Sequence, residues 1–450
     1  MRIGLFTDTY HPTLNGITFV VESLKRNLEA DGHEVYVFCP AKSMRPSRNS
    51  RLLVEDDRIR RLPSFPSGFF EDFDFTVFFP PRILREIKAM ELDVIHIFTP
   101  SQVGMLGINA AVKSDVPFVV QHSTDLYQYV KDYPNVFPGA LALVSIVLPT
   151  HTKLDGKDIK EIIKLYRPRR ALTKWNQEII AKGLTMAHSK ADAVIALSRK
   201  SEKQLRSWQE KNYRYKLTLM PNGVNAIPKP TKAQQQAFND QWGIKETDEV
   251  FGFVGRLAAE KNLPLLIKAM DKVGEVRPRA KLMFVGDFEY RQALEDMAAA
   301  SKFPDRIIFT GALPRHELGV AYGAFDVFCF PSMTDTQGWV LHEAAHASLP
   351  IIVCDTGVSE VVKNKKNGFH AKTTPSDFAA KLITLLSSPK KRASFGAESK
   401  RLANLYTEKK QIRLLEKLYR DIIAHHSERK QPKIHPLRRL TRRLLGRDYV

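Results

Sequence analysis

The sequence predicts an α/β protein with two doubly wound, parallel-sheet domains. The chain has 450 residues, of which 43% are hydrophobic, and this is more than one hydrophobic core usually supports. Short runs rich in β-branched and aromatic residues alternate with amphipathic helical patterns, and the same alternation starts again in the second half. Because parallel strands need crossover helices, both sheets are expected to be covered on both faces.

The expected elements follow this alternation along the chain. In the first half, a strand at 3–7 leads to a helix at 17–30, and further strands are expected at 34–39, 92–98, 116–121 and 193–198. In the second half, strands are expected at 250–254, 281–285, 306–310, 327–330 and 350–354. Pro, Gly and Asn cluster at 222–230, and this places the joint between the domains there.

Composition limits the class of protein. Cys39, Cys329 and Cys354 each lie in an apolar run, which fits buried, reduced side chains and indicates a cytosolic compartment. The N-terminus leads directly into a strand without the features of a signal peptide. The longest apolar stretch, 139–148, is bounded by prolines and is too short to span a bilayer.

The formal net charge is +20, which predicts attraction to a polyanion, either nucleic acid or an anionic lipid surface. Much of this charge lies at 153–174 and in the C-terminal tail. In the tail, a helical stripe of leucines is flanked by Arg438, Arg439, Arg442 and Arg443. A basic amphipathic helix that binds an anionic membrane is expected, and a disordered, solvated tail is the alternative.

Several polar residues follow predicted strands, where open α/β sheets bind ligands. Gly16 precedes the first helix, so its backbone could approach a phosphate, although an ordinary Asn-Gly turn is the alternative. His122 ends the strand at 116–121, and a structural histidine is the alternative there. Arg256 and Lys261 follow the strand at 250–254 and suit a pyrophosphate leaving group, whereas an isolated pair would be solvated surface charge.

Two carboxylates, Asp335 and Glu343, flank Gly338 and Trp339. They lie eight positions apart, so at about 3.6 residues per turn they would fall on different sides of one helix. Two separate contacts with sugar or ribose hydroxyls are expected, one before the helix and one within it. Gly338, between the two carboxylates, could present its backbone amide at a helix N-terminus. The alternative is that Asp335 caps the helix and that Glu343 stabilises its first turn.

Other site classes find little support. The sequence contains no Gly-x-Gly-x-x-Gly after a strand, no phosphate-binding Gly-x-x-x-x-Gly-Lys-Ser/Thr and no His/Cys cluster with zinc spacing. The acidic Asp72-Phe-Asp74 matches the short pattern of metal-dependent transferases but follows no predicted strand.

Assembled, these residues resemble the family 4 glycosyltransferases, which retain the anomeric configuration and have the GT-B architecture of two Rossmann-like domains with a cleft between them. The matching motifs are Phe6-Thr-Asp-Thr-Tyr10, Asn15-Gly16, Pro221-Asn-Gly-Val-Asn225, Val254-Gly-Arg256, Lys261 and Asn367-Gly368-Phe369. The resemblance implies an acceptor domain at 1–223, a donor domain at 224–400, a helix at 401–427 that packs back on the first domain, and a basic tail at 428–450.

The resemblance also assigns roles. It implies that Gly16 lies beneath the donor phosphates, that His122 contacts the transferred sugar, and that Arg256 and Lys261 bind the pyrophosphate. Asp335 falls where a glutamate contacts the sugar, and Glu343 where a second one holds the ribose. Gly338 and Trp339 belong to the same donor-binding motif, and the base is expected near 311–314.

One departure concerns the donor sugar, because the family usually has glutamate where this chain has the shorter Asp335. The phrase Thr334-Asp-Thr-Gln-Gly338 is most similar to the Thr-Glu-Thr-Gln-Gly of transferases that glycosylate diacylglycerol. The resemblance therefore implies transfer of a hexose from a nucleotide-sugar to a lipid acceptor at the inner face of the cell membrane. UDP-glucose is the first candidate for the donor. No metal or other cofactor is expected.

Three alternatives stay open. The acceptor could be a soluble or polyprenyl-linked glycan, or the donor could be GDP-mannose. A nucleic-acid-binding protein is disfavoured, because few aromatic residues are interleaved with the basic ones.

Overall fold

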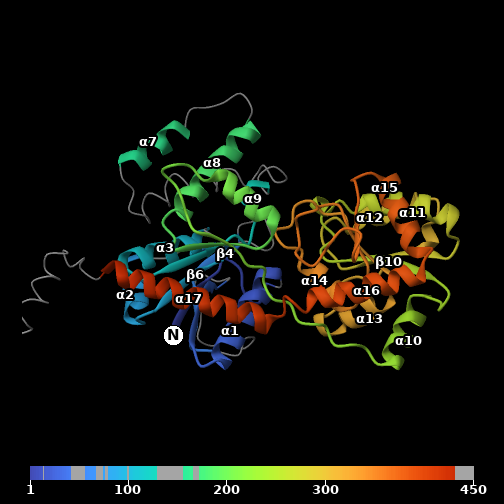
Figure 1. Ribbon diagram of the computed structural model, residues 1–450, viewed down its shortest axis with the longest axis horizontal. Coiled ribbons are helices and arrows are strands. Elements are labelled where there is room, and N and C mark those ends of the chain that lie inside the picture. The colour runs from blue at the N-terminus through green and yellow to red at the C-terminus, as the bar shows by residue number, and fades with distance from the viewer. Residues whose placement is uncertain are drawn as a thin grey trace, which may run out of the picture.

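The computed structural model describes residues 1–13, 15–41, 56–66, 74–76, 80–98, 101–128, 156–165 and 172–430. It confirms the predicted fold class, with two parallel sheets that belong to separate domains (Figure 1). The predicted tail residues Arg438, Arg439, Arg442 and Arg443 lie outside the described residues. The domain boundaries stay predictions.

The N-terminal domain is built on a seven-stranded sheet in the order β3-β2-β1-β6-β7-β8-β9. Its strands are β1 (Arg2–Phe6), β2 (Glu34–Pro40), β3 (Ile59–Leu62), β6 (Val94–Ile97), β7 (Phe118–Gln121), β8 (Ala193–Ala196) and β9 (Leu217–Leu219). Its helices are α1 (Gly16–Ala30), α2 (Pro80–Ala89), α3 (Gln102–Ser114), α7 (Gly156–Leu165), α8 (Leu172–His188) and α9 (Arg199–Trp208). A short antiparallel pair, β4 (Ser64–Pro66) and β5 (Asp74–Thr76), lies beside them.

The C-terminal domain repeats the plan with six strands in the order β12-β11-β10-β13-β14-β15. Its strands are β10 (Glu249–Val254), β11 (Ala280–Val285), β12 (Ile307–Phe309), β13 (Val327–Phe330), β14 (Ile351–Val353) and β15 (Gly368–His370). Its helices are α10 (Lys232–Gln241), α11 (Pro264–Val276), α12 (Arg291–Ala299), α13 (Leu318–Ala324), α14 (Trp339–His346), α15 (Pro375–Leu386) and α16 (Pro389–Ala403).

The central strands form because they are continuous apolar runs, as expected for strands buried on both faces. In the N-terminal sheet β1 pairs with β2 and β6, so that Ile3 lies between Val35 and Val94. Strand order reverses between β1 and β6 in this sheet, and between β10 and β13 in the other. The predicted site residues follow β1, β7, β10 and β13, and the fold therefore places them where ligands bind in open α/β sheets.

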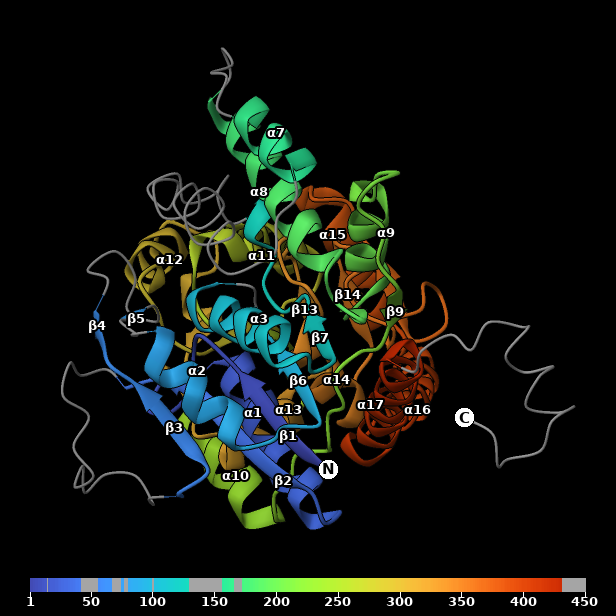
Figure 2. The same ribbon diagram turned by 90° about the vertical axis from the view of Figure 1, so that its left-hand side faces the viewer.

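The last helix, α17 (Glu408–Lys430), returns to the N-terminal domain (Figures 1 and 2). Apolar side chains on one of its faces join the core of that domain: Ile412, Leu415, Leu418, Tyr419 and Ile422. The phenol of Tyr419 lies 2.6 Å from His96 Nδ1, and Glu416 lies 2.6 Å from His33 Nε2. The chain thus passes twice between the domains, and Val224 N–H donates to Tyr406 O at 3.0 Å where the two passages meet.

Among the described residues, five strands were not predicted: β3, β4, β5, β9 and β15. Each is three or four residues long and lies at the edge of its sheet. Edge strands have one free side, so they do not need the apolar runs that reveal central strands. Across the described ranges, no helix combines the length and apolarity needed to cross a bilayer.

Candidate functional site

The loops after β10 and β13 meet at an ion pair between Lys261 and Asp335. Lys261 ends a short 3₁₀ helix, η3 (Ala259–Lys261), three residues before α11 begins. Its ammonium lies 2.8 Å from Asp335 Oδ1, and the Ser332 hydroxyl donates to Oδ2. Burial acts to raise the pKa of Asp335, but the Lys261 ammonium and the Ser332 hydrogen bond hold it below its usual value. Asp335 is therefore ionised at neutral pH.

Glu343 lies within α14, in a separate polar cluster. Gly338 is the N-cap of α14 in the left-handed conformation with φ 64°, so Asp335 does not cap the helix and Glu343 lies beyond its first turn. The carboxylate is 3% exposed. Arg315 donates to Oε1, and the Tyr322 hydroxyl donates to Oε2 at 2.8 Å.

An aromatic and cationic stack joins this cluster to the N-terminal domain. The Arg315 guanidinium lies 5.0 Å from the ring centroid of Trp339 and 5.4 Å from that of Phe19 on α1. Gly16 lies one turn before Phe19, and a Cβ added there would be 3.9 Å from the Trp339 indole. Gly16 and Trp339, predicted from separate motifs, therefore face each other across the two domains.

Arg256 follows β10 but turns away from the ion pair. Its guanidinium packs over the Phe288 ring at 4.6 Å and lies 3.3 Å from Glu260. The side chain is 43% exposed. Arg256 and Lys261 thus share a loop, but in this structure they contact different groups.

His122 follows β7 and is buried, with 2% exposure. Its ring packs edge-on against His188 at 6.2 Å and against Trp208 at 6.1 Å between centroids. Burial lowers the pKa of His122, so its imidazole is neutral at pH 7 although Asp125 acts in the opposite direction. The next residue, Ser123, accepts a hydrogen bond from Thr336 Oγ1 at 2.9 Å. The His122 loop therefore contacts the loop that carries Asp335.

Four site residues were not predicted from the sequence. Ser332 binds Asp335, Arg315 and Tyr322 hold Glu343, and Lys200 of α9 reaches the Asp335 loop from the N-terminal domain. Arg315 stands one residue beyond the 311–314 segment expected to lie near the base, so its position gave a partial signal. Tyr322 and Lys200 lie in ordinary helical patterns without one.

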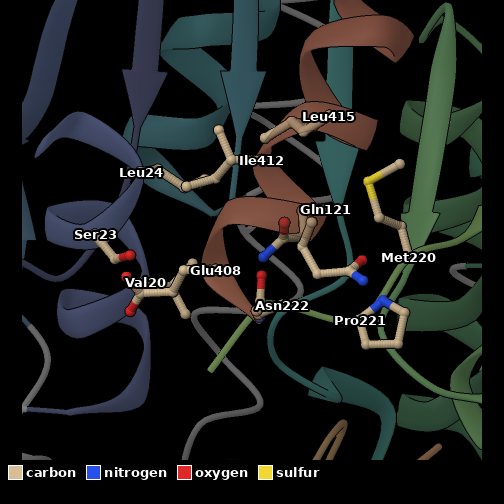
Figure 3. A pocket seen from close by; sticks show the side chains of 12 residues that line it. Val20, Ser23, Leu24, Gln121, Met220, Pro221, Asn222, Glu408, Ile412 and Leu415 are labelled. Atoms are coloured by element: carbon tan, nitrogen blue, oxygen red, sulfur yellow. The ribbon is translucent and has the colours of Figure 1, made fainter. Parts of the chain in front are cut away.

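A pocket lies apart from these residues, at the passage between the domains (Figure 3). Leu24 of α1 faces Ile412 and Leu415 of α17 there, and Gln121 lies at its polar side. None of the predicted donor-binding or catalytic residues lines it.

Two family profiles match the chain. One, described as Glycosyltransferase Family 4, matches residues 14–226, and the other, described as Glycosyl transferases group 1, matches residues 234–402. Together they extend over both sheet domains.

Individual proteins match over most of the chain. The alpha-monoglucosyldiacylglycerol synthase of Acholeplasma laidlawii is 28% identical over 441 residues, which covers 95% of this chain and 99% of that protein. A GDP-mannose-dependent alpha-mannosyltransferase of Mycobacterium tuberculosis is 27% identical over 359 residues, covering 79% and 80%. The solved sucrose-phosphate synthase from Thermosynechococcus elongatus has the same fold, with a TM-score of 0.68 at 18% identity and coverage of 94% and 99%.

Proposed function

Because this chain belongs to the family 4 glycosyltransferases, with their GT-B fold, we propose that it transfers glucose from UDP-glucose to a hydroxyl of diacylglycerol. The general activity, that of a glycosyltransferase of the glycolipid-synthesising type, is supported by both family profiles and by the relative from Acholeplasma laidlawii. The donor, the acceptor and retention of the anomeric configuration are our proposal.

The observation that carries the proposal is the ion pair between Lys261 and Asp335, which joins the loops at the carboxyl ends of β10 and β13. Lys261 would neutralise the diphosphate as the glycosidic bond breaks, and Arg256 would turn from Phe288 to join it. Asp335 would accept hydrogen bonds from the glucose hydroxyls and Glu343 from the ribose. Lys261 must then divide its hydrogen bonds between Asp335 and the phosphate.

The chemistry would proceed by attack on the face that the leaving group vacates. None of the predicted site carboxylates stands free as a nucleophile, since Asp335 and Glu343 are both held by cations. The leaving phosphate would take the proton of the acceptor hydroxyl, and no metal is needed for that transfer. A neutral His122 would contact the sugar through hydrogen bonds without adding charge near the anomeric carbon.

A lipid acceptor is supported by the relative that makes a glucosyldiacylglycerol and by the net charge of +20. The tail from 429 carries eight Lys and Arg residues, and each contributes about 1 kcal/mol near an anionic bilayer. We propose peripheral attachment to the inner face of the membrane.

One alternative follows from a specific observation. The mannosyltransferase relative makes GDP-mannose the second candidate donor.

The proposal is tested with purified protein, diacylglycerol in mixed micelles and either UDP-glucose or GDP-mannose. We expect only UDP-glucose to raise the melting temperature and to yield an α-linked glucolipid, with EDTA leaving the rate unchanged. Stabilisation by a cognate donor grows with the ratio of its concentration to its Kd. Stabilisation and transfer with GDP-mannose alone would show that UDP-glucose is not the donor. A β-linked product would exclude retention of the anomeric configuration.

A further inference from the structure

Lys200 belongs to the N-terminal domain, yet its side chain ends in the C-terminal domain. It is the second residue of α9, which lies on the side of its domain that faces the other one (Figure 1). Its ammonium pairs with Asp355 Oδ2 at 2.8 Å, and it donates to the carbonyl oxygens of Met333 and Asp335, the latter at 3.3 Å. Three oxygens of the C-terminal domain therefore surround one cation.

The backbone around Lys200 is closely fitted as well. Its N–H donates to Gly357 O at 3.0 Å, and a Cβ on Gly357 would lie 3.2 Å from Lys200 Cβ. The Lys200 side chain is 25% exposed. An ammonium largely withdrawn from water costs free energy unless oxygen atoms replace its hydration, and this arrangement supplies them.

The position of Asp335 therefore depends on both domains. From its own domain, Lys261 and Ser332 bind the carboxylate. From the other domain, Lys200 binds the backbone carbonyls on either side of Thr334. Ser201 Oγ donates to Thr336 O at 3.3 Å and extends the same contact.

We propose that Lys200 is a positioning residue, which docks the N-terminal domain onto the 333–337 loop and thereby sets the place of Asp335. The donor site is then complete only while the two domains are engaged. This inference rests on the proposed function for its effect on catalysis, but the docking itself does not.

The first test compares Lys200→Met, which removes the charge and keeps the length, with Lys203→Met on the same helix. Lys203 is exposed and lies outside the donor site. In the transfer assay we expect Lys200→Met to lower kcat by about 10- to 100-fold, the scale of a displacement of about 1 Å. The KM for UDP-glucose should stay close to wild type, because Arg256 and Lys261 are intact, and Lys200→Arg should recover part of kcat.

The second test does not need the reaction. Small-angle X-ray scattering should give a larger radius of gyration for Lys200→Met than for wild type and Lys203→Met. If wild type transfers no glucose, the proposed function fails and the scattering still decides the docking role. A Lys200→Met protein with unchanged kcat and unchanged scattering overturns the inference.

A folding control accompanies both tests. The melting temperature of Lys200→Met should stay within a few degrees of wild type. If it unfolds in the assay, Asp355→Asn replaces it, since that change removes the charge of the partner with little change of shape. The same loss of kcat is expected there, and wild-type kcat in that variant would contradict the proposal.

Discussion

At Glu343, two donors from consecutive elements of the C-terminal domain meet on one buried carboxylate. Arg315 begins the short 3₁₀ helix η5 (Arg315–Glu317), and Tyr322 lies on α13, which follows it directly. Burial and the charge of Glu343 raise the pKa of the Tyr322 phenol well above its usual value, so the hydroxyl remains a donor. A ribose that binds Glu343 would share or displace these donors.

We predict that Glu343→Gln and Glu343→Ala both lose transfer but differ in stability. Glutamine keeps an oxygen for Tyr322, whereas alanine leaves a buried hydroxyl without a partner, which costs about 1–3 kcal/mol. Arg315 is 35% exposed and can be solvated in either variant. Urea unfolding measures the difference in stability and the transfer assay measures the loss of activity, with the exposed Glu317→Gln as the control. Wild-type turnover in Glu343→Gln would remove Glu343 from the donor site.

Asp8, two residues after β1, is half-buried as a whole, but the Oδ2 atom of its carboxylate is buried. Its Oδ1 accepts from Val103 N–H at 2.8 Å in the first turn of α3, and Oδ2 has no hydrogen-bond partner within the described ranges. Burial raises the pKa of Asp8 to about 7, against the smaller effect of backbone hydrogen bonds. Between its ordinary pKa and about 7, the folded state thus binds a proton that the unfolded state has released.

Stability should therefore fall as pH rises through this interval, because the folded form holds more protons there. We predict that wild type loses about 4 kcal/mol relative to Asp8→Asn between pH 4 and pH 8, about 1.4 kcal/mol for each pH unit between the ordinary pKa and the raised one. Urea unfolding across this pH range measures the difference. The exposed Asp421→Asn is the control, and a pH-independent difference would refute the assignment.

Among the elements, the two passages between the domains hold the relative positions of α1 and α17. Asn225 Nδ2 donates to Glu408 Oε2 at 2.8 Å, and Arg26 of α1 lies 3.3 Å from the same oxygen. Gly223 fits against this site, where an added Cβ would lie 2.4 Å from Glu408 Cα and 2.7 Å from Thr407 O. These neighbours are backbone atoms, so they cannot move aside as the end of a flexible side chain can.

Gly223→Ala should therefore destabilise the protein by about 1–3 kcal/mol, the usual range for overpacking. Gly156→Ala is the matched control, because a Cβ added there meets no atom within 4 Å. Urea unfolding compares the two variants. If both unfold like wild type, the passages are less tightly packed than the structure indicates.

For the whole molecule, the distribution of charge predicts attachment to an anionic membrane. Four tail arginines, Arg438, Arg439, Arg442 and Arg443, are the proposed membrane contact. Changing all four to glutamine should release the protein from anionic vesicles at low salt. The control changes four exposed lysines of the C-terminal domain to glutamine and should leave vesicle binding intact; they are Lys245, Lys268, Lys365 and Lys366.

Co-sedimentation measures this binding, and added salt should weaken it because exposed charges are screened. Equal release by both sets of changes would attribute binding to net charge rather than to the tail. If the intact protein does not co-sediment with anionic vesicles, attachment to the membrane is contradicted.

How far the fold could be predicted depends on burial. The central strands β1, β10 and β13 have continuous apolar runs, and the sequence located each within a residue or two. The edge strands β3, β9 and β15 gave no such pattern, because a strand with one free side is not required to be apolar. In the same way Asp335, Glu343 and Lys261 could be proposed from their motifs, whereas their partners Ser332, Arg315 and Tyr322 could not.

The sequence alone determined the two-sheet architecture, the family resemblance and the motif residues, since burial periodicity and short motifs are local properties of the chain. Only the tertiary structure decided that Lys261 pairs with Asp335, that Trp339 faces Gly16, and that Lys200 reaches the Asp335 loop. These contacts join residues far apart in the chain. The first depends on how two loops of the C-terminal domain meet, and the other two depend on how the two domains are set against each other; no local pattern encodes either arrangement.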